Sequence, residues 1–149
     1  MTRVSHLLKV YDHIAVLRNP ELWNRARLAA LGKFAAENQG KKFNPSGVKE
    51  FPDRKIESQE KAMGRVQGYF EGTEPRVATN RAVYFCSELV TAAFIQVGII
   101  DQSAAVLFSP ETFSPEDIGK DKAFGYFCGY VISYPEYEIP DTDYFRYSL

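Results

Sequence analysis

The stretch from Val83 to Gly98 constrains the fold more than any other, because a short apolar strand leads directly into an apolar helix. Val83-Tyr84-Phe85 carries the β-branched and aromatic side chains typical of a strand. Cys86-Ser87-Glu88 then opens a helical pattern with one apolar face, formed by Leu89, Val90, Ala93, Phe94 and Val97. Gly98 is typical of a helix end. The pattern predicts a deeply buried helix.

The sequence before this helix predicts a strand, a second helix and an inserted segment. Asp12 to Leu17 is short, apolar and rich in β-formers. Asn19 and Pro20 then provide a helix cap and a first-turn proline, and the helical pattern continues to about Gln39. Its predicted core face consists of Trp23, Ala26, Ala30, Leu31 and Phe34. From residue 41 to 80, Pro and Gly residues break the pattern around one helix, Ile56 to Phe70, and we interpret this stretch as an insertion.

The sequence after the helix predicts two short turns, a strand and a tail. Ser109-Pro110 and Ser114-Pro115 each place a capping serine before a first-turn proline. Phe124 to Tyr134 has the composition of a strand, and the last fifteen residues, rich in Pro, Tyr and acidic groups, predict an extended tail. Nine Tyr and eleven Phe are more simply explained as core residues than as the lining of a substrate cleft.

Length and charge exclude several classes of protein. A chain of 149 residues has the size of one domain, so we expect a single domain over 1–149 with the insertion at about 41–80. The net charge of -1 gives no field that would attract nucleic acid. No apolar run reaches the 18 residues of a membrane span, and no secretory signal follows Met1. We therefore expect a soluble chain that stays in the cytoplasm, where it is made.

Cys86 is the candidate nucleophile. A cysteine attacks a carbonyl as its thiolate, and the positive end of a helix favours that form. The backbone N–H groups of the first turn can also hold a developing oxyanion. The alternative is a structural cysteine, as most unpaired cysteines are. We interpret both cysteines as thiols, and Cys128, inside the last predicted strand, as a small buried hydrophobic residue.

Several segments resemble one known family in the same order. Tyr84-Phe85-Cys86-Ser87-Glu88-Leu89-Val90 is similar to the aromatic-aromatic-Cys-Ser-Glu-Leu-Val signature of the circularly permuted NlpC/P60 papain-like hydrolases. Tyr11 to Arg18 resembles the family's strand ending in Arg, and Gly40-Lys41-Lys42-Phe43-Asn44 resembles its Gly-x-Pro-Tyr-Asp turn. The segment 108–113, Phe-Ser-Pro-Glu-Thr-Phe, resembles the Ser-Pro segment that follows the cysteine helix. The resemblance covers most of the chain.

The chain departs from this family at the turn and at the histidine. The turn has Phe43-Asn44 in place of Tyr-Asp, and its distance from Cys86 is longer than in the family. The resemblance also implies a catalytic histidine on an earlier strand, which the family's order would place ahead of Met1; an upstream start would supply it. Within the chain, only His6 and His13 can provide the imidazole. His13, at the start of a predicted strand, is the candidate base, with a hydrogen-bonded strand-end histidine as the alternative, and we expect His6 to lie on the surface.

The remaining polar residues suggest neither a metal nor a cofactor. The two histidines and two distant cysteines lack the close spacing of zinc ligands, so we expect no metal and no cofactor. Glu88 favours the positive helix end and could also orient a partner. Asp12 and Glu88 are the acids that could act as a third catalytic member.

The resemblance implies an α+β, papain-like fold in which a small antiparallel sheet packs on the Cys86 helix, with the helix from Asn19 to Gln39 alongside. It implies a cysteine hydrolase, such as a peptidase or amidase acting on cell-wall peptides or acyl compounds through a Cys86 thioester. The partner would be a peptide or an acyl-containing small substrate. Two alternatives stay open: a truncated or degenerate, non-catalytic papain-like module, and an acyltransferase of the lecithin:retinol type.

Overall fold

The computed structural model describes residues 3–44, 51–73, 77–107 and 109–148. In the helix that begins at residue 51, the side chains of residues 51–55 and 58 are not described. The fold is mixed α+β, as the sequence predicts. The chain divides into two compact units. The terminal unit consists of Met1–Pro20 and Phe124–Leu149, and the central unit consists of Glu21–Ala123.

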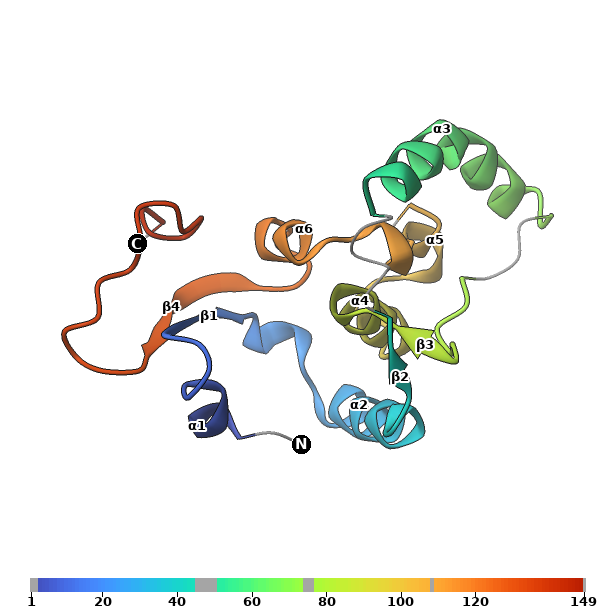
Figure 1. The fold of residues 1–149 in the computed structure, drawn as a ribbon. Coiled ribbons are helices and arrows are strands. Elements are labelled where there is room, and N and C mark those ends of the chain that lie inside the picture. Colours follow the sequence, from blue (N-terminus) through green and yellow to red (C-terminus); the bar gives the residue numbers. More distant parts are fainter. Residues whose placement is uncertain (1–2, 45–50, 74–76, 108, 149) are drawn as a thin grey trace. The chain divides into compact units, whose positions relative to one another are not determined.

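The terminal unit is built on two antiparallel strands. β1 (His13–Arg18) pairs with β4 (Tyr126–Ile132), from His13 opposite Ile132 to Arg18 opposite Tyr126 (Figure 1). A short helix, α1 (Val4–Leu7), precedes β1. The register shifts between Val16 and Leu17, whose partners are Gly129 and Phe127, so β4 has a β-bulge at Cys128. Both predicted strands and the small antiparallel sheet are therefore present.

The segment after β4 folds back in turns, so the predicted extended tail is wrong in this respect. Turns and bends occupy most of the described part of 133–148. The ring of Phe145 stacks on Phe127 of β4, with centroids 4.6 Å apart and an interplanar angle of 10°. The Asp143 carboxylate reaches both β1 and β4. These contacts replace the extended form because they bury aromatic surface and satisfy polar groups at once.

In the central unit, the first long helix begins later than the predicted Asn19. Pro20–Leu22 forms only a 3-10 turn, η1, and α2 runs from Arg25 to Asn38. Asn24 is the true N-cap, since its side chain accepts a hydrogen bond from the N–H of Arg27 at 2.9 Å. Among the residues of the predicted core face, Phe34 is buried in α2. Leu31 packs beside it.

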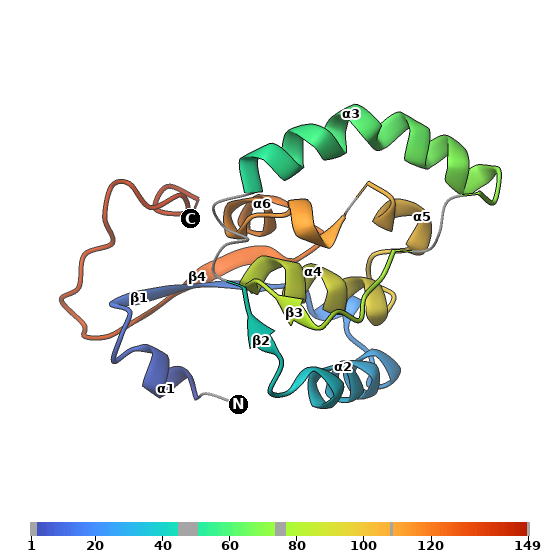
Figure 2. The same cartoon turned by 45° about the vertical axis from the view of Figure 1, so that its right-hand side comes forward.

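The predicted insertion contains a short strand and a long helix. β2 (Lys42–Phe43) pairs in parallel with β3 (Val83–Tyr84), and α3 spans Phe51–Phe70, beginning earlier than the predicted Ile56. Residues 45–50 and 74–76 of this segment lie outside the described residues. Figure 2 shows α3 as the longest helix of the central unit. In the described ranges, no helix is both long and apolar enough to cross a membrane.

Both predicted Ser-Pro turns are present, but Ser109 makes no side-chain capping hydrogen bond, and a short helix that was not predicted precedes the turns. α5 covers Gln102–Ala105, η3 covers Pro110–Thr112 and α6 covers Pro115–Lys120. The N–H of Asp117 donates to the Ser114 hydroxyl, which confirms Ser114 as a cap. Phe108, the first residue of the segment that resembles the family, lies outside the described residues.

The buried face of the cysteine helix, α4 (Cys86–Gln96), matches the predicted one only in part, since Ala93 and Val97, the residue after the helix, are buried as predicted. Its buried residues are Ser87, Glu88, Thr91, Ala92, Ala93 and Ile95. Leu89 and Val90, predicted to be core, are 36% and 39% exposed. The reason is the position of α2, since Phe34 packs on Ala92 and Ala93 while Leu89 and Val90 line an apolar groove of about 310 Å³ between the two helices. The prediction that α2 lies alongside is confirmed.

The aromatic residues are divided between interior and surface. Phe34, Tyr84, Phe85 and Phe124 are buried. Other aromatic residues are more than half exposed, among them Phe43, Phe70 and Tyr147. The interpretation of the aromatic surplus as core is therefore wrong for part of the set. A domain of this size leaves much apolar surface in contact with water.

Candidate functional site

Cys86 is an exposed thiol at the first residue of α4. Its neighbours in sequence are buried: Phe85 is 1% exposed, Ser87 2% and Glu88 3%. Phe85, the N-cap, has extended backbone angles, with φ of -102° and ψ of 169°. The chain thus enters the helix from a strand and presents sulfur 86 at the surface where the helix begins. This is the position in which the helix dipole favours a thiolate.

The N-cap of α4 is aromatic, and this leaves the first helical turn without the usual cap. Phe85 has no side-chain acceptor, so its side chain takes none of the first-turn N–H groups. The reciprocal half of a capping box is present, since the Glu88 carboxylate accepts the Phe85 N–H at 3.2 Å. A Ser, Thr, Asp or Asn at this position usually stabilises a helix by about 1 kcal/mol. The chain gives up that stability beside its candidate nucleophile.

A cleft of about 100 Å³ opens at Cys86. Its lining comes from α2, the following turn, β2, β3 and α4, namely Asn38, Lys41, Lys42, Phe43, Tyr84, Phe85, Cys86 and Leu89. The two lysines bring positive charge to the rim. A larger hollow of about 450 Å³ lies between α3 and the η3–α6 segment, but none of the predicted site residues lines it. We place the candidate site at the smaller cleft because it contains the thiol.

The turn that resembles the family's Tyr-Asp turn lies beside the cysteine strand, although 38 residues separate Asn44 from Val83 in sequence. Phe43 pairs with Tyr84, and the N–H of Asn44 donates to the Tyr84 carbonyl at 2.8 Å. The parallel β2–β3 pair therefore brings this turn to the cleft. The long intervening segment does not displace it.

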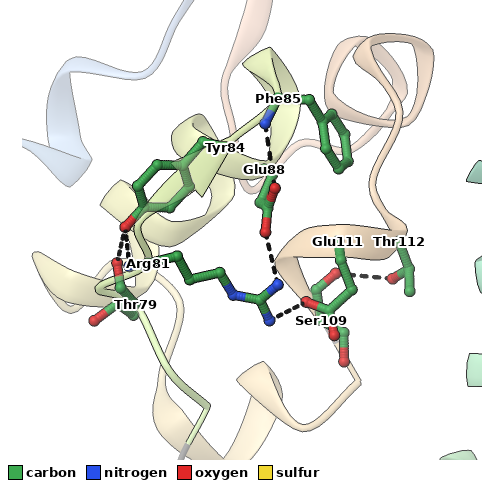
Figure 3. Close-up of polar contacts among 8 residues, drawn as sticks. All are labelled: Thr79, Arg81, Tyr84, Phe85, Glu88, Ser109, Glu111 and Thr112. Atoms are coloured by element: carbon green, nitrogen blue, oxygen red, sulfur yellow. Dashed lines mark hydrogen bonds and ion pairs between the residues drawn. The ribbon is translucent and has the colours of Figure 1, made fainter. Parts of the chain in front are cut away.

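Glu88 is held by an ion-pair network (Figure 3). The Arg81 guanidinium contacts the Glu88 carboxylate at 2.8 Å and the Glu111 carboxylate of η3 at 3.0 Å. Glu88 thus caps α4 and pairs with Arg81, which accounts for its burial. Sequence reasoning singled out Glu88 as a possible third member but missed Arg81 and Glu111. No spacing rule links residues seven and thirty positions apart in this way.

His13 lies in the terminal unit, and both of its ring nitrogens have hydrogen-bond partners there. Nε2 is 3.0 Å from Asp143 Oδ2 and Nδ1 is 3.1 Å from the Tyr137 hydroxyl. The Tyr137 ring also stacks on the imidazole at 5.5 Å. Cys86 belongs to the other unit. The contacts of His13 in the described chain are those expected of a hydrogen-bonded strand-end histidine.

Asp143 is the acid that pairs with His13, and sequence reasoning missed it. Partial burial raises the pKa of this carboxyl, but the hydrogen bonds from Tyr130, from the Phe145 N–H and from His13 outweigh it and hold the pKa below its ordinary value. Burial, followed by the hydrogen bond to Asp143 and its negative charge, raises the pKa of the Tyr130 phenol to about 12. The residue is 130 positions from His13, and no local signal marks it.

One further acid, Asp12, and one further histidine, His6, were considered from the sequence. Asp12 is exposed, and its backbone carbonyl accepts a hydrogen bond from the N–H of Ser133, the residue after β4, at 2.9 Å. His6 is exposed on α1, as predicted. Within the described residues, no group of three or more His, Cys, Asp or Glu side chains could hold a metal ion.

Cys128 is exposed, so its interpretation as a buried hydrophobic residue is wrong. It is the extra residue of the β4 bulge, and a bulge changes the direction in which a side chain points. Its Sγ lies 3.3 Å from the Tyr126 carbonyl oxygen. The chain therefore has two exposed thiols, one at a helix N-terminus and one on a strand.

Comparison of the chain with protein-family models, with curated proteins and with solved structures gave no match in any of the three.

Proposed function

We propose that the chain is a thiol-dependent hydrolase that cleaves amide, peptide or acyl bonds through a thioester on Cys86. One observation supports this above the others: an exposed thiol stands at the first residue of α4, beside a cleft, with an N-cap that has no acceptor side chain. The sequence around Cys86, which resembles the permuted NlpC/P60 signature, supports the same chemistry.

The proposed reaction has two steps. The Cys86 thiolate attacks the substrate carbonyl carbon, forming a C–S bond, and the tetrahedral oxyanion is held by N–H groups of the first turn of α4. When the intermediate collapses, the C–N or C–O bond breaks and the amine or alcohol leaves with a proton from the general acid. Water then attacks the thioester, releasing a carboxylic acid and returning the thiol. The substrate class is a peptide or an acyl-containing small molecule.

We propose His13 as the imidazole that accepts the thiol proton. Its pairing with Asp143 is the arrangement that orients a catalytic histidine and stabilises the imidazolium. In such an arrangement the second ring nitrogen faces the nucleophile, and in this structure Nδ1 faces Tyr137 instead. Catalysis by His13 therefore requires that the Tyr137 hydroxyl give way.

Selective alkylation tests the proposal, and Cys128 serves as an internal reference because it is also exposed. Iodoacetamide labelling of both thiols, read by peptide mass spectrometry between pH 5 and 9, should show Cys86 reacting faster than Cys128 at the acidic end of this range. His13→Ala should remove the low-pH reaction of Cys86 alone. Equal pH profiles for the two thiols would contradict the proposal.

Acyl transfer to the protein provides the second readout. With p-nitrophenyl acetate, intact mass should show one added acetyl group on Cys86 that disappears with time, and Cys86→Ser should show none. Capture of the acetyl group by added glycerol or an amine in place of water would indicate the acyltransferase of the lecithin:retinol type.

The alternative from another class is a non-catalytic papain-like module that retains the fold and Cys86 without a base. The hydrogen bonds that occupy both ring nitrogens of His13 favour it. It predicts ordinary reactivity at Cys86 and no effect of His13→Ala on that reactivity.

A further inference from the structure

Arg81 joins two acidic side chains from separate elements (Figure 3). Its Nη1 donates to Glu88 Oε1 at 2.8 Å and its Nη2 to Glu111 Oε2 at 3.0 Å. The Glu88 side chain is 4% exposed, whereas those of Arg81 and Glu111 are 36% and 31% exposed. A buried carboxylate needs a partner of opposite charge, because desolvation of an unpaired charge is strongly unfavourable. In the described structure, Arg81 provides that charge for Glu88.

The second oxygen of Glu88 is used at the entrance of the cysteine helix. Oε2 accepts the N–H of Phe85, the residue directly before Cys86. Because the Phe85 side chain cannot cap the first turn, this bond, together with the burial of the Phe85 ring, holds the N-cap residue. The position of Cys86 therefore depends on where Glu88 lies, and Glu88 depends on Arg81.

Arg81 is itself fixed to the strand that precedes Cys86. Its backbone N–H donates to the Tyr84 hydroxyl at 2.7 Å, and that hydroxyl donates to the Thr79 carbonyl at 2.7 Å. On the other side, Glu111 belongs to η3, where the Thr112 hydroxyl donates to the Ser109 carbonyl at 2.8 Å. The guanidinium thus connects the approach to β3, the start of α4 and the Ser-Pro turn.

We propose that Arg81 is a positioning residue for the Cys86 reaction, an inference that rests on the proposed function. It does not touch the substrate. Its guanidinium, which bridges Glu88 and Glu111, holds the Glu88 carboxylate in place, so that Phe85 and the first-turn N–H groups of α4 keep the geometry that an oxyanion requires. Without Arg81, the buried Glu88 carboxylate loses the cation that offsets its desolvation, and we expect it to turn toward water and leave the Phe85 N–H without this acceptor.

Three variants test this inference, with acetylation by p-nitrophenyl acetate and the pH profile of iodoacetamide labelling as readouts. Arg81→Met should slow acetylation of Cys86 by at least about tenfold, because small displacements of a reacting group cost that much or more. Labelling of Cys128 should not change. Arg81→Lys should recover part of the rate, since an ammonium group cannot bridge two carboxylates as a guanidinium does.

The third variant combines Arg81→Met with Glu88→Gln. The glutamine amide oxygen can still accept the Phe85 N–H, and it carries no charge that needs Arg81. We expect this double variant to acetylate Cys86 faster than Arg81→Met alone. A merely structural arginine would not show this rescue. Lys33→Met, which removes an exposed cation of α2, is the matched control and should leave both readouts unchanged.

The outcomes separate this inference from the proposed function. If wild-type Cys86 reacts no differently from Cys128, both fail. If wild-type Cys86 is selectively reactive and Arg81→Met keeps its rate and pH profile, the proposed function stands and the role of Arg81 is refuted. Loss in Arg81→Met without recovery in the double variant also refutes it. If Trp23 fluorescence shows that Arg81→Met is unfolded, Arg81→Lys carries the test, and an unchanged rate there refutes the inference.

Discussion

Replacing Asp143 by asparagine should loosen the terminal unit, because the carboxylate joins the C-terminal turns to both strands. Its Oδ1 accepts the Tyr130 hydroxyl and, at 2.9 Å, the Phe145 N–H, while Oδ2 lies 3.0 Å from His13 Nε2. Asparagine keeps the Oδ1 acceptor and loses the charge. The substitution therefore isolates the charged part of the interaction from its shape.

The expected loss follows from the strength of charged and neutral hydrogen bonds. Hydrogen bonds to charged groups contribute about 1.5–3 kcal/mol and neutral ones about 0.5–1.5 kcal/mol, so each bond should weaken by about 1 kcal/mol. The Asp143 side chain is 19% exposed, so solvent screens it only partly. The three bonds together give about 3 kcal/mol, which partial solvent screening reduces to an expected loss of about 1–2 kcal/mol, or a roughly 5–30-fold larger equilibrium constant for opening of the strands.

Amide hydrogen exchange of the peptides that cover β1 and β4 measures this opening directly. The matched control is Asp141→Asn, which removes a carboxylate that is 78% exposed and paired with Arg146 on the surface. Exchange in α4 should not change in either variant. Identical exchange of β1 and β4 in wild type and Asp143→Asn at pH 7, or an equal effect of Asp141→Asn, would refute the reasoning.

The same variant has a defined pH dependence. The pKa of Asp143 is lower in the folded unit than its ordinary value, so its contribution is present above the ordinary carboxyl range near 4 and is lost as pH falls through the folded value. Wild-type protection of β1 and β4, corrected for intrinsic exchange, should therefore decrease in acid. Protection in Asp143→Asn should decrease less.

Three further predictions concern single side chains. The pKa of Tyr130 is raised to about 12, so the stabilising effect of its neutral phenol is present below pH 10 and is lost between pH 10 and 12. Amide hydrogen exchange of β4, corrected for the intrinsic rate, should therefore become faster over this pH range in wild type, and less so in Tyr130→Phe. Phe34→Ala, at 5% exposure, should lower the free energy of unfolding by about 3 kcal/mol in urea titrations followed by Trp23 fluorescence, while Leu28→Ala, at 56% exposure, should change it by less than about 0.5 kcal/mol. Asn24→Ala should cost about 1 kcal/mol in the same titration, and Asn24→Ser should cost little.

Short-range rules predicted the elements that carry Cys86. The change from a strand pattern to a helical one placed the helix start at Cys86, and Ser114 caps its turn as the Ser-Pro spacing indicates. These signals act over a few residues, so the sequence contains them complete. The same rules misplaced the start of α2, because Asn19 and Asn24 are both acceptable caps and only the folded chain chooses between them.

The candidate site was predicted at its thiol but not in its surroundings. Cys86 was identified from its local pattern, whereas Arg81, Glu111 and Asp143 were not, since no spacing rule links them to partners 7, 30 and 130 positions away. The exposure of Cys128 depends on a bulge whose register only the pairing with β1 sets.

The sequence alone determined the main strands and helices apart from some of their ends, that the thiol stands at a helix start, and which residue types could act beside it. These properties depend on capping, periodicity and side-chain chemistry, all of which are local. The tertiary structure decided which face of α4 is buried, which cation neutralises Glu88 and which acid pairs with His13. Such choices are made by packing and by the cost of unpaired buried charge, and both act between residues that the sequence keeps apart.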